Sequence, residues 1–190
     1  VLQTAIAQAL FPDNTYSKNS GGDPDHIPEL TYEHYLDFYH KYYHPSNSYI
    51  YLYGDMDVKE RLEWMDRAYL SAYESMEIDS NIPMQKPFDA MKFVETTFPI
   101  TDDDPEENNT YLSYNMVIAD VLDPTLYQAF TVLDYVLVSA PGAPVRQALI
   151  DAGIGQDVYG SYENEMLQPF FSIVAKNANK EEQERFVTII

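Results

Sequence analysis

The sequence predicts an α+β protein of two domains, each an antiparallel sheet packed with helices. Three observations predict this class. Apolar residues recur at helical spacing in several segments, and short runs rich in β-branched and aromatic residues lie between these segments. A proline-containing stretch without periodicity separates two dissimilar halves. Because 45% of the residues are hydrophobic, the chain has enough apolar content to bury a core.

The first half is predicted to hold helices over residues 1–11, 32–44 and 58–76 and a strand over residues 48–53. Thr31 can cap the second helix, and Pro45 ends it. The strand sequence SYIYLY is β-branched and aromatic. The apolar face of the second helix consists of Tyr32, Tyr35, Leu36, Tyr39, Tyr42 and Tyr43. We expect this face to pack against a sheet that contains the strand.

Residues 77–90 contain Pro83 and Pro87, lack periodicity and are predicted to be a linker. The domain assignment is therefore residues 1–76, a linker over 77–90, and residues 91–190. The second domain is predicted to hold strands over residues 91–99, 110–118, 156–162 and 168–176 and helices over residues 124–139, 144–152 and from 180 onward. We expect its last two strands to form a hairpin.

Composition excludes several classes of function. The net charge is −20, with −9 in residues 1–90 (15 acidic, 6 basic) and −11 in residues 91–190 (16 acidic, 5 basic). Nucleic-acid binding needs clustered Lys and Arg, so nucleic acid is not an expected partner. The acidity is a source of solubility, or it steers basic peptides toward the protein. The chain has no cysteine and no apolar run long enough for a membrane span, so we expect neither disulfides nor a membrane partner.

The helix over residues 32–44 carries the strongest local candidate for a metal site. Glu33, Asp37, His40 and His44 share one face at the spacing of a helix. However, Lys41 stands where a zincin would have its glutamate base, and His44 directly precedes Pro45, where a histidine suits the helix end. No H-x-x-E-H, H-E-x-x-H or G-x-S-x-G motif occurs in the sequence. We therefore expect no catalytic residue and no metal ligand in these 190 residues.

Four blocks of sequence resemble the presequence-protease branch of the insulinase-type (pitrilysin-type) zinc metallopeptidases. The blocks are Ser20-Gly21-Gly22-Asp23-Pro24, Ile27-Pro28-Glu29-Leu30-Thr31, Tyr43-His44-Pro45-Ser46-Asn47 and Tyr53-Gly54-Asp55. The likeness continues through residues 137–155 and 167–172. Such enzymes are inverzincins, which bind zinc through H-x-x-E-H.

The resemblance implies that homologous domains recur along a much longer chain. This sequence would span the last part of a first peptidase-type domain and the first part of a second, non-catalytic one. The zinc ligands would precede the segment that residues 1–11 resemble, so Zn²⁺ would be a cofactor of the parent protein and not of this fragment. Neither end of the sequence has a helix cap or stop signal, which is typical of an internal fragment.

In insulin-degrading relatives, an edge strand of the second domain anchors the substrate by strand addition. The resemblance places this function on Val158, Tyr159 and Gly160, which otherwise form an ordinary hairpin strand. The predicted function is thus a fragment of a zinc metalloendopeptidase that degrades peptides in a closed chamber and is inert by itself. The alternative is a non-catalytic structural or peptide-binding subunit of the same fold. The implied location is the cytoplasm in a bacterium or an organelle matrix in a eukaryote.

Overall fold

The computed structural model describes residues 1–190. The chain forms two compact units. Unit 1 contains Val1–Lys18 and Pro83–Ile190, and unit 2 contains Asn19–Ile82. The predicted division into residues 1–76 and 91–190 with a linker over 77–90 stays a prediction.

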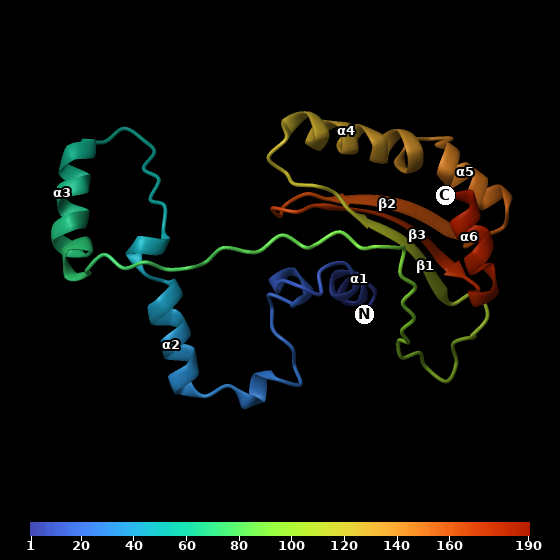
Figure 1. Ribbon diagram of the computed structural model, residues 1–190, viewed down its shortest axis with the longest axis horizontal. Helices are drawn as coiled ribbons and strands as arrows, with labels where there is room; N and C mark the ends of the chain where they lie inside the picture. Colours follow the sequence, from blue (N-terminus) through green and yellow to red (C-terminus); the bar gives the residue numbers. More distant parts are fainter. The chain divides into compact units, whose positions relative to one another are not determined.

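Unit 1 is built on a three-stranded antiparallel sheet with the strand order β1-β3-β2 (Figure 1). The strands are β1 (Thr110–Val117), β2 (Asp157–Glu163) and β3 (Phe170–Ala178). In the register, Asn115 of β1 lies opposite Ser172, and Gly160 of β2 lies opposite Ile173. The predicted α+β class and the predicted hairpin of the last two strands are confirmed.

Helices cover one face of this sheet, on the side where Figure 1 shows α4, α5 and α6. Their bounds are α4 (Pro124–Asp134), continued by a π-helical turn, η5 (Tyr135–Ser139), α5 (Pro144–Asp151) and α6 (Gln183–Ile189). The Asp123 side chain caps α4 by accepting the N–H groups of Thr125 and Leu126. The buried core between helices and sheet consists of Leu112, Ile118, Val138, Leu149, Ile154, Val158, Phe171, Ile173, Ala175, Ala178 and Phe186.

The opposite face of the sheet packs against α1 (Leu2–Leu10), whose buried side chains are Ile6 and Leu10. Phe11 and Phe170 complete this second cluster, with ring centroids 6.0 Å apart. The hydroxyl of Tyr16 accepts the backbone N–H of Leu167 at 2.9 Å. Residues 1–18 therefore belong to unit 1, and Ile6, Leu10 and Phe11 are part of its buried interior.

A buried glutamine ties three distant parts of unit 1 together. The backbone N–H of Gln85 donates to the side chain of Gln168 at 2.7 Å, which donates back to the Gln85 carbonyl at 3.2 Å. The Gln85 side chain also accepts the N–H of Asp13 at 3.0 Å and donates to its carboxylate at 2.7 Å. We call Asp13, Gln85 and Gln168 the glutamine clip. Although residues 77–90 form no helix or strand, Gln85 is only 6% exposed.

Unit 2 contains α2 (Tyr32–Tyr42) and α3 (Val58–Ala68). The Thr31 side chain caps α2 by accepting the His34 N–H at 3.2 Å, as the sequence predicted. Helix α3 ends well before the predicted limit, residue 76, and is followed by a short 3₁₀ turn. No residue of this unit is buried. The turn after α3 is η4 (Leu70–Ala72), and the other 3₁₀ turns of the chain are η1 (Thr15–Ser17), η2 (Ile27–Glu29), η3 (Pro45–Asn47) and η6 (Lys180–Glu182).

Two predicted strands are not formed, and both predictions are wrong for the same reason. Residues 48–53 and 91–99 have the composition of strands, but neither makes a ladder with another strand. A strand exists only when a neighbour completes its hydrogen bonds. The expected packing of the tyrosine-rich face of α2 against Ile50 also fails, since Tyr35, Tyr39 and Ile50 are exposed. No helix is long and apolar enough to span a membrane.

Candidate functional site

The register of the sheet determines which backbone groups of β2 are free. The N–H of Ile118 donates to the Pro169 carbonyl at 2.8 Å, in register with the pairing of β1 and β3. The backbone N–H and C=O groups alternate in direction along a strand. Odd-numbered residues of β3 therefore direct these groups to β1, and even-numbered residues direct them to β2. On β2, the residues opposite the even-numbered residues of β3 are Asp157, Tyr159, Ser161 and Glu163, and these make the hydrogen bonds between the two strands. The intervening residues of β2 therefore direct their N–H and C=O groups to the open edge of the sheet.

Two of the three predicted substrate-binding residues, Val158 and Gly160, are among these edge residues. No other protein group forms a hydrogen bond with their backbones. Val158 is only 2% exposed, so its edge groups are not accessible to a ligand. Gly160 is half-buried and leaves its backbone within reach of a ligand. The accessible part of the edge thus begins at Gly160.

Gly160 lies directly under the helical layer. A Cβ atom at this position would lie 2.5 Å from Oδ1 of Asp134 and 3.1 Å from Cβ of Val138. The Asp134 Oδ1 atom is buried and has no hydrogen-bond partner, while its Oδ2 atom accepts the Ser139 hydroxyl at 3.0 Å. The glycine is therefore required by close packing of η5 against β2 as well as by any role at the edge.

Tyr159 points to the other face of the sheet and is 36% exposed. Burial raises the pKa of its hydroxyl, and the neighbouring Tyr111 raises this pKa further. The hydroxyl therefore stays protonated at neutral pH and can donate a hydrogen bond. Its backbone is occupied by β3, so Tyr159 can contribute only its side chain to a ligand.

Tyr162 is an edge residue that the sequence did not indicate. Its backbone alternates in phase with Gly160, and its ring packs on Phe130 with centroids 5.6 Å apart. The phenolic oxygen is buried without a hydrogen-bond partner, and burial raises the pKa of this group. The signal that could have identified Tyr162 is its spacing of two residues from Gly160, which puts both on the same edge.

The candidate metal ligands on α2 do not form a metal site. No group of three or more His, Asp or Glu side chains in the structure could hold a metal ion. His44 instead accepts the N–H of Ser46 through Nδ1 at 3.2 Å, and its ring contacts Tyr73 edge-on at 5.2 Å. His44 therefore defines the turn after α2, which is a structural role.

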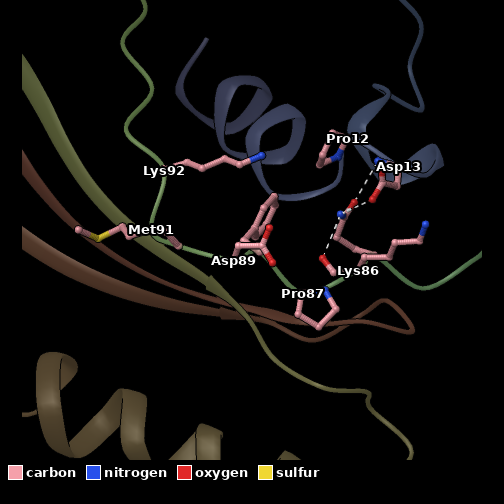
Figure 2. Close-up of a pocket in the computed structure, with 10 residues that line it drawn as sticks. Pro12, Asp13, Lys86, Pro87, Asp89, Met91 and Lys92 are labelled. Carbon is pink, nitrogen blue, oxygen red and sulfur yellow. Dashed lines mark hydrogen bonds between the residues drawn. The ribbon is translucent and has the colours of Figure 1, made fainter.

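A pocket of about 370 Å³ lies beside the glutamine clip, lined by Pro12, Asp13 and residues 85–92 (Figure 2). The dashed lines near Asp13 in Figure 2 mark hydrogen bonds of the clip. The Asp13 carboxylate is already held by Gln85, and the pocket gathers no nucleophile with an adjacent base. The pocket therefore has the chemistry of a structural junction.

Known proteins match this chain over its whole length. The family described as "Peptidase M16 inactive domain" matches residues 29–190. Protein HypA of Clostridium perfringens is 44% identical over 190 residues, which are 100% of this chain and 20% of that protein. Presequence protease 1, chloroplastic/mitochondrial, of Arabidopsis thaliana is 34% identical over 194 residues, covering 100% of this chain and 18% of that protein. The mitochondrial presequence protease of Xenopus tropicalis is 32% identical over 197 residues, covering 100% and 19%. The chain thus spans about a fifth of the length of these relatives.

Proposed function

Because this chain belongs to the peptidase M16 family, we propose that it is part of a zinc-dependent metalloendopeptidase that degrades peptides in a closed chamber. The chain's membership of this family confirms the resemblance to insulinase-type peptidases found in the sequence. The observation that carries the proposal is the alignment of the complete chain with proteins named presequence protease. In this proposal, residues 1–190 supply part of the enclosure and none of the catalytic groups.

Zinc does not fit the residues present. The only histidines at metal-binding spacing, His40 and His44, gather no third ligand. We propose that the zinc of the whole protein is held by residues outside 1–190, and that this stretch by itself neither binds zinc nor cleaves peptides. Within the whole protein, zinc would polarise the scissile carbonyl and activate water.

The role of unit 1 is to hold substrate at the edge of β2. An extended peptide can hydrogen bond to the free N–H and C=O groups of Gly160 and Tyr162, as in other strand-addition sites. Val158 would support this edge from the core, and the Tyr159 hydroxyl would donate from the adjacent face. Because backbone groups make the contacts, this mode accepts many peptide sequences. The net charge of −20 favours basic peptides among them.

The proposed cellular location is inferred from the names of the relatives, several of which are described as mitochondrial or chloroplastic. An organelle matrix is proposed for a eukaryotic source and the cytoplasm for a bacterial one. The rival function is a non-catalytic structural or peptide-binding subunit of the same fold. It is favoured by one observation, the match to a domain described as inactive.

The two functions differ in a peptidase assay on the whole protein. A quenched fluorescent basic peptide should be cleaved, and a chelator should abolish cleavage until zinc is restored, whereas residues 1–190 should give neither cleavage nor a stoichiometric zinc signal after dialysis. A whole protein that binds the peptide but never cleaves it would establish the rival function. Tight zinc binding by residues 1–190 that disappears in His40→Ala would contradict the proposal.

Strand addition at β2 is tested with a pair of ligands that have the same side chains. A short synthetic basic peptide should slow amide exchange at Gly160 and Tyr162, whereas its alternately N-methylated analogue, which lacks the necessary donors, should not. Equal protection by both peptides would show that binding does not use the edge.

A further inference from the structure

An acidic residue interrupts the apolar stripe that α4 and η5 present to the sheet. The residues four positions apart along this helical segment are Leu126, Phe130, Asp134 and Val138, and all but Asp134 are apolar. The three apolar members belong to the main core cluster of unit 1 or pack against it. A helix that only packs on a sheet has no need of a carboxylate in its stripe, and departures of this kind are typical of functional sites.

The stripe follows β2, the strand at the open edge of the sheet. The rings of Phe130 and Tyr162 have centroids 5.6 Å apart, and both Asp134 and Val138 contact the position of Gly160. Both α4 and η5 contact β2, so this part of the helical layer lies over the edge strand (Figure 1). Asp134 is therefore next to the backbone groups that an added peptide would use.

The Asp134 carboxylate has no positively charged partner. Its Oδ1 atom is buried without a hydrogen bond, and none of the salt bridges includes Asp134. Burial of a charge is costly unless a counter-charge or a donor compensates for it. The Oδ2 atom accepts the hydroxyl of Ser139, which is exposed, so the carboxylate can be reached from the Ser139 side. The position therefore offers a carboxylate beside the edge that lacks only its cation.

We propose that Asp134 binds the ammonium or guanidinium group of a lysine or arginine in the peptide residue opposite Gly160. This inference rests on the proposed function, because it requires a peptide added to β2. Directly opposed residues of neighbouring strands point their side chains to the same face, with Cβ atoms about 4.5–5.5 Å apart. The side chain opposite Gly160 thus lies on the face of Asp134, and the glycine places no side chain between them. The long stem of a basic residue spans the remaining distance to the carboxylate.

The preference for a basic residue is confined to one position of the peptide. Residues two positions away on either side also face the helices, but they meet the apolar surroundings of Tyr162 and Val158. The intervening residues point to the opposite face of the sheet. A general attraction by the net charge of −20 would instead favour lysine at every position alike. Position dependence therefore distinguishes a specific pair from general attraction.

Binding of single-lysine peptides to the 190-residue chain tests this pair. An extended, otherwise uncharged peptide, capped at both ends, carries one lysine that is moved along it, and each version is compared with its norleucine analogue. At one position, lysine should bind at least about tenfold more tightly than norleucine, and Asp134→Asn should reduce this gain to about twofold or less. The matched control is Glu163→Gln, which removes the same charge from an exposed residue of β2 on the opposite face and should retain the gain.

Equal gains at every position, or a gain that survives in Asp134→Asn, would overturn the pair. Carbodiimide coupling on the unmodified chain gives an answer that does not depend on the folding of a variant. The lysine of the preferred peptide should form an amide with Asp134, located by mass spectrometry, and coupling only to other carboxylates would overturn the pair.

The same peptides distinguish failure of this pair from failure of strand addition. If the norleucine peptide slows amide exchange at Gly160 and Tyr162 but lysine brings no gain, the pair with Asp134 is wrong and the proposed function stands. If no peptide slows exchange at these residues, both are wrong.

Discussion

At the scale of single residues, Gly160 determines how closely the helices approach β2. Gly160→Ala would place a Cβ atom 2.5 Å from Asp134 Oδ1 and 3.1 Å from Val138, so η5 and β2 must separate. Overpacking of this kind costs about 1–3 kcal/mol. We therefore predict that the free energy of unfolding of unit 1 falls by about that amount, measured by urea denaturation with circular dichroism.

A double-mutant cycle provides the control. Asp134→Ala removes the closest contact of the new Cβ, so the additional cost of Gly160→Ala should be smaller in that background. The same cost in both backgrounds would contradict the close contact between Gly160 and Asp134.

The raised pKa of Tyr159 makes the stability of unit 1 dependent on alkaline pH. An unfolded tyrosine ionises near pH 10, whereas folded Tyr159 retains its proton to higher pH. Its contribution to stability is therefore constant below about pH 10 and is lost as pH rises through the folded pKa. The difference in ultraviolet absorbance between the wild type and Tyr159→Phe should give a midpoint above that of free tyrosine. A midpoint at or below about pH 10 would contradict the raised pKa of this hydroxyl.

At the scale of elements, the glutamine clip joins the turn after α1, the extended stretch after unit 2 and the residues just before β3. Gln85→Ala would leave the Asp13 N–H without its acceptor and the Asp13 carboxylate without its donor. Each hydrogen bond contributes about 0.5–1.5 kcal/mol net, so we predict that the loss of these two bonds costs about 1–3 kcal/mol in urea unfolding. The neighbouring Lys86→Ala is the control and should stay within about 0.5 kcal/mol, because Lys86 is exposed. Equal losses in the two variants would show that the clip does not stabilise the unit.

Local signals predicted the helices better than the strands. Thr31 caps α2, and Pro124 begins α4, because caps and prolines act on their own segment of chain. Residues 48–53 and 91–99 carry equally strong local signals but lack a partner, and no local signal supplies one. The candidate site shows the same limit. The resemblance indicated Val158, Tyr159 and Gly160, whereas the register with β3 puts Val158, Gly160 and Tyr162 at the edge. Spacing of two residues from Gly160 links Tyr162 to the edge only once the register shows that Gly160 lies there.

At the scale of the molecule, the two units differ in how much they bury. Unit 1 has two buried clusters, whereas unit 2 has no buried residue. Since slow exchange requires buried and cooperatively held hydrogen bonds, peptides from residues 19–82 should exchange their amides well before those from β3. Hydrogen exchange with mass spectrometry on the 190-residue chain measures this order. Simultaneous exchange of α2 and β3 would show that unit 2 is stabilised as strongly as the sheet.

The central strand of the sheet, β3, is the last of its three strands to be synthesised, which has a consequence for synthesis on the ribosome. Leu167 is 151 residues after its partner Tyr16, a stretch that takes about 8–30 s to synthesise at about 5–20 residues per second. Gln168 follows its partner Gln85 by 83 residues, and Ser172 follows its partner Asn115 by 57 residues. Three sets of early contacts are thus postponed to one late moment, when residues 167–178 emerge. A nascent chain arrested before that moment exposes α1 and β1 together, and such a chain is a natural client for chaperones.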